Sequence, residues 1–174
     1  TDTVEIYNPT TTAINIGGWY LSDSTTFEKY RILDDTSVAA GSYVTFDESQ
    51  FNPNGEWNPE RGAQGATEFS FSGSKGDQVY LVQTDASGNL IRVVDHVEFG
   101  PTRSGESIGL WADADGVFTP MASFTSGATN SDPRIGPVVI TEIMYNPGTM
   151  INASELEFIE IHNSGTSDEN LDAW

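Results

Sequence analysis

Short runs of alternating apolar and polar residues predict that this chain is built almost entirely from β-strands. The alternation is clearest at 90–100, where odd positions from Ile91 to Phe99 read as the inward face of a half-buried strand. Asp95 falls on that inward face and would need a polar partner. No window of helical length shows a period of about 3.6, so we expect very little helix. β-branched and aromatic residues, which favour strands, concentrate in YVTF at 43–46, FSFSG at 69–73, QVYLVQT at 78–84 and LIRVVDHVEFG at 90–100.

Turn-forming residues separate these runs and predict antiparallel pairing. In DASGN at 85–89 a glycine stands where a tight turn needs positive φ, so the runs on either side should form a hairpin. DADG at 113–116 separates SIGLW from VFTPM in the same way. Asn, Pro and Gly enrich 49–68, which we interpret as a long surface loop. Strands of this length and spacing predict an all-β fold, an antiparallel β-sandwich.

The chain repeats its own opening near its end. VEIYNPTTTAINIGGW at 4–19 returns as IEIHNSGTSDENLDAW at 159–174, an offset of 155 positions. Solenoid repeats are much shorter, so this offset indicates whole modules in tandem. We therefore expect one module at 1–131, a linker at 132–137 and the opening strands of a second repeat at 138–174.

The strand expected at 138–145 has no counterpart ahead of Thr1. The first module should then lack its first strand, which exposes backbone donors and acceptors along an edge. The later strand can fill that gap, either within the chain or by β-strand addition to a neighbouring chain. A plain tandem polyprotein without such insertion is the alternative. The residues expected to make the contact are Val138, Val139, Ile140, Ile143 and Tyr145.

Acidic residues outnumber basic ones by 26 to 7, which gives a net charge of −19. Such a surface repels nucleic acid and anionic membranes, because both are bound through clustered Lys and Arg. It attracts divalent cations, although simple solubilisation in salt is the favoured interpretation. Cysteine is absent, which excludes disulfides and thiol chemistry. No apolar run approaches the roughly 20 residues that span a bilayer, so no membrane insertion is expected.

Two short motifs bear on catalysis and metal binding. GESIG at 105–109 matches a nucleophile-elbow pattern at Ser107, but that motif needs a strand-to-helix turn, and only His96 and His162 could serve as its base. ADADG, with Asp113 and Asp115, resembles half a calcium loop whose remaining ligands are missing. A hairpin turn explains the same residues equally well. We expect no enzyme and no obligatory cofactor, and Ca²⁺ at the two aspartates stays an open alternative.

Glutamates recur on the opening strands, at Glu5, Glu142, Glu157 and Glu160. If two of them lie opposite one another across strands, the like charges destabilise the pair. Alternate solvent-facing positions are the simpler interpretation, because the period of two predicts them.

The tryptophans are expected to have different structural roles. Trp19 and Trp174 are repeat equivalents, so we expect both to anchor a core. Trp57 lies in the polar loop, where a large aromatic side chain either contacts a glycan or neighbour or tucks onto its own module.

Six blocks, in order, resemble the lamin tail domain, a module also found in large secreted bacterial proteins. VVITEIMYNP followed by ELEFIEIHNSG resembles its opening, and later blocks match GGWYLSD, SVAAGSYVTF, GDQVYLVQTDASGNLIRVVDHVEFG, RSGESIGLWADADGVF and FTSGATNS. Ser126 stands where the family's ending has Pro, and the loop at 49–68 makes the module longer than a minimal one. The resemblance implies an immunoglobulin-like fold and a binding or structural role, with no catalytic residues to carry over.

Together these features predict a non-catalytic module of an extracellular or cell-surface protein, a filament, stalk or adhesin subunit made of tandem sandwiches. Its expected partners are copies of itself or adjacent repeats, and beyond them other surface proteins or glycans. The alternative is a calcium- or carbohydrate-binding accessory domain of a larger secreted enzyme.

Overall fold

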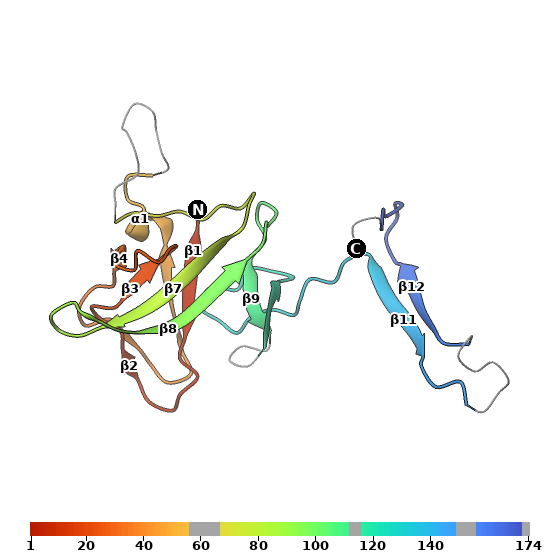
Figure 1. Ribbon diagram of the computed structural model, residues 1–174, viewed down its shortest axis with the longest axis horizontal. Coiled ribbons are helices and arrows are strands. Elements are labelled where there is room, and N and C mark those ends of the chain that lie inside the picture. Colours follow the sequence, from red (N-terminus) through yellow and green to blue (C-terminus); the bar gives the residue numbers. More distant parts are fainter. Residues whose placement is uncertain (56–66, 112–115, 149–155, 172–174) are drawn as a thin grey trace. The chain divides into compact units, whose positions relative to one another are not determined.

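The computed structural model describes residues 1–55, 67–111, 116–148 and 156–171. The chain divides into two compact units, Thr1–Pro133 and Arg134–Trp174, and the division falls inside the linker expected at 132–137. Figure 1 shows strands in both units and one short helix. No helix of the described residues is long and apolar enough to cross a membrane.

The strands of the first unit pair antiparallel throughout. The largest sheet has four strands in the order β4-β3-β7-β8. Its strands are β3 (Tyr20–Ser22), β4 (Tyr30–Arg31), β7 (Asp77–Thr84) and β8 (Leu90–Phe99). Three further pairs are β1 (Thr3–Tyr7) with β6 (Tyr43–Asp47), β2 (Ile14–Asn15) with β5 (Ser37–Val38), and β9 (Ile108–Trp111) with β10 (Val117–Pro120). The two predicted hairpins, 78–84 with 90–97 and SIGLW with VFTPM, are confirmed as β7–β8 and β9–β10.

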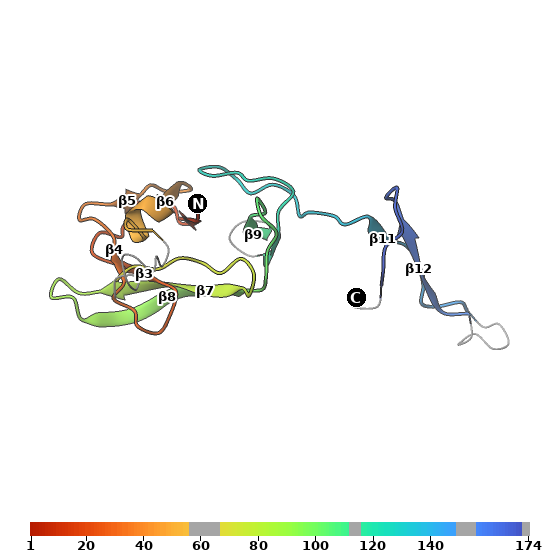
Figure 2. The ribbon, with the colours of Figure 1, turned by 90° about the horizontal axis from the view of Figure 1, so that it is seen from above.

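The core of the first unit lies between two layers, which Figure 2 shows with β5 and β6 above β3, β7 and β8. Leu21 and Leu81 contribute from the four-stranded layer, and Phe46 contributes from β6. Trp19 is 9% exposed in the same cluster, so its predicted role as a core anchor is confirmed. Apolar side chains from both layers are thus removed from water together, which defines a β-sandwich. The predicted all-β antiparallel sandwich is confirmed.

The described part of the second unit contains one antiparallel hairpin, β11 (Val138–Met144) paired with β12 (Phe158–Asn163). Its open end is closed by Ser164, whose N–H and hydroxyl both donate to the Pro137 carbonyl, at 2.7 and 2.8 Å. The hairpin carries the repeat equivalent of β1, because an offset of 155 maps β12 onto Thr3 to Asn8.

The interpretation of 49–68 as a surface loop is wrong at its start. A one-turn helix, α1 (Glu48–Phe51), begins there, capped by Asp47 and Gln50 in a capping box. Phe51 is fully buried and stacks on Phe69 at 4.6 Å between ring centroids. Residues 56–66, and with them Trp57, lie outside the described residues.

The strand predicted at 69–73 does not form a ladder, although Phe69 joins the core. Carboxylates accept its backbone donors instead: the N–H of Phe71 donates to Asp2 Oδ2 at 2.6 Å, and that of Ser72 to Asp77 Oδ2 at 2.9 Å. Side chains have replaced a partner strand, which satisfies the same backbone groups.

The half-buried strand predicted at 90–100 is correct in extent and wrong in burial. β8 is the edge of its sheet, and its side chains from Leu90 to His96 are exposed. Two register shifts leave Ile91 and Val94 without a partner opposite them, so the regular alternation of faces is lost. Asp95 is exposed, and its carboxylate accepts the His96 N–H at 2.8 Å.

Candidate interaction site on the C-terminal hairpin

Four isoleucines form an apolar face on the hairpin of the second unit. Ile140 lies opposite Ile161, and Ile143 lies opposite Ile159, so all four point to the same side. They are 62%, 50%, 55% and 64% exposed in that order. A two-stranded hairpin is marginally stable at best alone, and contiguous exposed apolar surface of this kind makes the hairpin a candidate contact site.

A β-bulge at Thr141 creates this face. Residues three apart in a regular strand point to opposite sides, so Ile140 and Ile143 would be separated. The register shifts between Ile140 and Glu142, which inserts Thr141 as an extra residue and returns Ile143 to the side of Ile140. The bulge therefore concentrates the apolar side chains of β11 on one surface.

Of the other residues predicted to interact, Val138 lies on the same face as Ile140, two positions before it, and Val139 does not. Val138 and Val139 are half-buried, and Val139 lies opposite His162 on the reverse side of the hairpin. Tyr145 follows the end of β11 and is 80% exposed. The structure thus brings the five predicted residues onto or next to one strand, and it divides them between two faces.

The repeat equivalents of the hairpin isoleucines are packed in the first unit. Val4 and Ile6 of β1 correspond to Ile159 and Ile161, and both contact the core cluster as partly buried residues. The same strand sequence is therefore half-buried where a sandwich surrounds it and exposed in the hairpin.

An asparagine motif also recurs in both copies, buried at Asn8 and exposed at Asn163. In the first unit Asn8 Nδ2 donates to the Thr12 carbonyl at 2.8 Å, and its Oδ1 accepts the Thr10 N–H at 3.0 Å. In the second unit Asn163 makes the equivalent bonds, to the Ser167 carbonyl at 2.7 Å and from the Gly165 N–H at 2.9 Å. The two copies hence share their local loop geometry.

Like charges meet on the reverse face of the hairpin. Glu142 lies directly opposite Glu160, which is the arrangement that destabilises a cross-strand pair. The hydroxyl of the bulged Thr141 donates to Glu160 Oε1 at 2.5 Å and offsets part of that repulsion. Glu157 lies outside the ladder.

The motifs considered for catalysis and metal binding belong to other parts of the sequence than the hairpin. Asp113 and Asp115 lie outside the described residues. Across the ranges that are described, no group of three or more His, Cys, Asp or Glu side chains could hold a metal ion. Ser107 precedes β9, its carbonyl accepts the Met121 N–H at 2.9 Å, and none of the described hydrogen bonds joins it to a histidine. His96 stacks on Tyr80 at 4.1 Å in the exposed surface of β8.

Perturbed pKa values mark structural groups of the first unit. Burial raises the pKa of Tyr30, and the Asp47 carboxylate raises it further. Asp85 lies in the β7–β8 turn, and the hydrogen bond from the side-chain amide of Asn89 lowers its pKa. Tyr30 packs on Phe46 in the core, and Asp85 holds a turn, so neither has the setting of a catalytic group.

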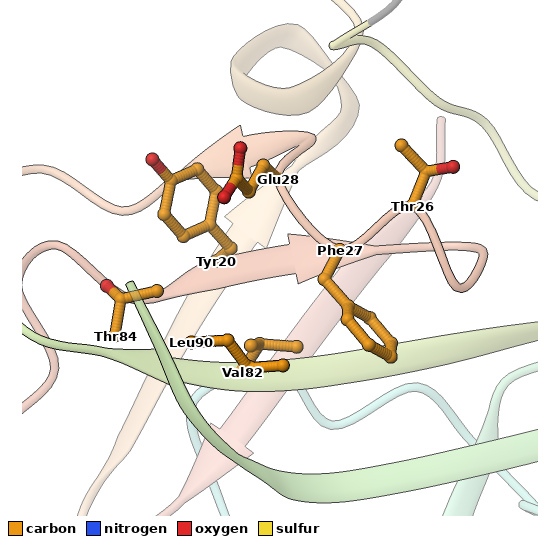
Figure 3. Close-up of a pocket in the computed structure, with 7 residues that line it drawn as sticks. All are labelled: Tyr20, Thr26, Phe27, Glu28, Val82, Thr84 and Leu90. Carbon is orange, nitrogen blue, oxygen red and sulfur yellow. The ribbon is translucent and has the colours of Figure 1, made fainter. Parts of the chain in front are cut away.

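A cavity of about 210 Å³ lies on the outer surface of the four-stranded sheet. Figure 3 shows it beside β3 and β7, with Phe27, Val82 and Leu90 as its apolar lining. Thr84 is also in the lining, but its hydroxyl already donates to the Gly18 carbonyl at 2.8 Å. Ligand sites usually measure about 300–1,000 Å³ and contain several convergent polar groups, so this cavity is the weaker candidate.

Comparison with known families identifies the family to which the first unit is related. The family model of the Lamin Tail Domain matches residues 1–100, more than half of the chain. The chain belongs to the lamin tail domain family. Its sandwich is immunoglobulin-like, and the family is one of non-catalytic modules. The matched part of the lamin tail domain runs from β1 to β8. No curated protein and no solved structure matches the chain.

Proposed function

We propose that this lamin tail domain chain is a structural module of an extracellular or cell-surface array, and that its copies associate through the C-terminal hairpin. The exposed isoleucine face carries the proposal. Half of this face comes from β12, whose repeat equivalent β1 packs against a sandwich core. We therefore expect the exposed face to be covered by β-structure as well. The module acts by contact, without catalysis.

Charge and spacing support an array. With a net charge of −19 the modules repel one another at long range and stay soluble, so a specific apolar contact is needed to join them. The residues expected as the linker, 132–137, are too few to let neighbouring units move far apart. Short linkage between sandwiches suits a stalk or filament.

The size of the apolar face limits how strongly copies of the chain can associate. Full burial of an isoleucine contributes about 1.5–3 kcal/mol, so covering four half-exposed side chains contributes about 4 kcal/mol. Because association also costs translational and rotational freedom, this burial allows a dissociation constant no tighter than about 1 mM for separate chains. A short covalent link supplies an effective concentration in the same millimolar range, so linked modules should be associated and free chains only weakly so.

Sedimentation equilibrium from about 100 μM to about 3 mM tests the proposal, since this range extends to both sides of about 1 mM. The wild-type chain is compared with the double variant Ile140→Ser/Ile143→Ser. The control is Leu33→Ser/Val117→Ser, which removes apolar side chains that are 68% and 73% exposed in the first unit. Wild type and control should gain mass with concentration, and the hairpin variant should stay monomeric. A monomeric wild-type chain at the highest concentration, or equal association of all three, contradicts the proposal.

A further inference from the structure

The cavity on the outer surface of the four-stranded sheet is formed by residues that alternate with the core. Leu21 and Leu81 lie opposite one another and contribute to the core of the first unit. Their neighbours Tyr20 and Val82 also form a cross-strand pair, so both side chains point to the outer side of the sheet. Val82 is 1% exposed and lines the cavity together with Leu90. The cavity therefore has an apolar base on the sheet.

The segment between β3 and β4, residues 23–29, supplies the rest of the lining and is held by its own contacts. Ser22, at its start, is fully buried, and the hydroxyl oxygen lies 2.8 Å from the Thr26 carbonyl oxygen. Lys29 and Asp23 form an ion pair that joins the two ends of the segment. Side chains presented by a segment fixed in this way lose little conformational freedom when a ligand binds.

Two aromatic rings and one carboxylate line the same cavity. Figure 3 shows Tyr20, Phe27 and Glu28 around it. The Phe27 ring is held by an edge-on contact with Tyr80 of β7, with the ring centroids 5.3 Å apart. Aromatic rings attract cations, and a carboxylate pairs with them through charge-assisted hydrogen bonds. An apolar base beside a negative charge suits a basic side chain, which has a methylene stem and a charged end.

The Glu28 carboxylate is available to such a ligand. Among the described residues, no hydrogen bond or ion pair engages it. The two basic residues that follow it in the sequence are Lys29, which pairs with Asp23, and Arg31, which pairs with Asp34. Glu28 is exposed, so an incoming ammonium group displaces only water from its carboxylate.

The size and polarity of the cavity favour one long basic side chain over other ligands. Its volume of about 210 Å³ is below that of most small-molecule sites and is enough for a single extended side chain. A sugar needs several convergent hydrogen-bonding groups, whereas the Thr84 hydroxyl already donates to the Gly18 carbonyl. An anion would be repelled by Glu28 and by the net charge of −19. The same net charge attracts a partner with a basic surface.

We infer that this cavity binds one lysine side chain of a partner protein with a basic surface. The methylene groups of the lysine lie on Val82, and its ammonium group lies at Glu28 beside the two aromatic rings. The inference goes beyond the proposed function and does not depend on it. This surface belongs to the sandwich of the first unit, whereas copies of the chain associate through the hairpin of the second.

An NMR titration of the isotope-labelled chain with the peptide acetyl-Gly-Lys-Gly-amide tests the inference. The control peptide has norleucine in place of lysine, which keeps the methylene groups and removes the charge. The variant Glu28→Gln is compared with Glu98→Gln. Both remove one exposed carboxylate from the first unit, and Glu98 of β8 does not line the cavity.

The lysine peptide should shift the amide signals of Phe27, Glu28 and Thr84 with a dissociation constant of about 1–10 mM, as expected for one exposed ion pair with an aromatic contact. Glu28→Gln should weaken this binding about two- to fivefold, and Glu98→Gln should leave it unchanged. The norleucine peptide should cause much smaller shifts.

Three results overturn the inference: no shift of these signals, equal shifts with the norleucine peptide, or equal affinities of the two variants. A shift with the disaccharide maltose and none with the lysine peptide also overturns it, in favour of a sugar site. None of these results bears on association through the hairpin, because every signal that is measured belongs to the first unit.

Discussion

Asn8 provides the sharpest test of how the repeated motif stabilises the module. Its side chain is 2% exposed and joins two segments of the first unit. Nδ2 donates to the carbonyls of Thr12, Val38 and Ala39, at 2.8, 2.9 and 3.1 Å. Oδ1 accepts from the N–H and the hydroxyl of Thr10, at 3.0 and 2.7 Å. The substitution Asn8→Ala removes all of these bonds at once.

The expected cost follows from burial. Each hydrogen bond contributes about 0.5–1.5 kcal/mol net, and a buried carbonyl left without a donor costs about 1–3 kcal/mol more. With the Val38 carbonyl buried beside Asn8, we expect Asn8→Ala to lower the free energy of unfolding by about 3–5 kcal/mol. For a unit of this size that corresponds to a melting temperature lower by roughly 10–20 °C.

The internal repeat provides a matched control, Asn163→Ala. Asn163 makes the same two local bonds but is exposed, so its loss should change the unfolding of the first unit by less than about 0.5 kcal/mol. Urea unfolding followed by tryptophan fluorescence measures both variants, because Trp19 is buried in the core. A cost below about 1 kcal/mol for Asn8→Ala, or equal costs for the two variants, refutes the assigned role of the buried motif.

Three further predictions concern backbone, charge and pairing. Gly76→Ala should cost about 1–3 kcal/mol more than Gly88→Ala in urea unfolding, because both glycines have positive φ but only at Gly76 would the new Cβ strike a neighbouring backbone carbonyl; equal costs would be inconsistent with this packing. The pKa of Asp85 is lowered from 3.8 in the folded chain, so its stabilising contribution is present at neutral pH and is lost as the pH falls through the lowered value; an NMR titration midpoint at or above 3.8 would contradict this. Glu142→Gln removes the repulsion from Glu160 and should slow hydrogen exchange of β12 in dilute solution about two- to fivefold, an effect that should shrink in high salt; unchanged exchange would argue against the repulsion.

Much of the fold could be predicted from local sequence. The strands of a hairpin are close together in the sequence, so the strand runs and the turn between them can be recognised in one short segment. Trp19 in the core and the β7–β8 turn followed directly. Helix α1 was missed because one turn shows no period of 3.6, although Asp47 and Gln50 form a capping-box signature that could have revealed it. The strand expected at 69–73 failed because two carboxylates take its backbone N–H groups, one from Asp2, which is distant in sequence, and one from Asp77, five residues after Ser72.

The candidate site was predictable in its residues and not in its geometry. Apolar composition and the repeat pointed to Ile140 and Ile143, yet simple alternation places them on opposite faces. Only the bulge at Thr141 brings them together, and a bulge depends on pairing across the hairpin, which a single strand does not encode. The exposure of β8 could not be predicted from its own sequence for the same reason, because its two register shifts depend on its pairing with β7.

Hydrogen exchange of β11 at two protein concentrations tests most directly whether the hairpin is an association element. The account predicts rapid exchange of the amides from Val138 to Met144 in dilute solution, where a two-stranded hairpin is marginal, and marked slowing near 1 mM. β7, inside the sandwich, should exchange at the same rate in both samples. Amides of β11 that exchange equally at the two concentrations would contradict the central claim.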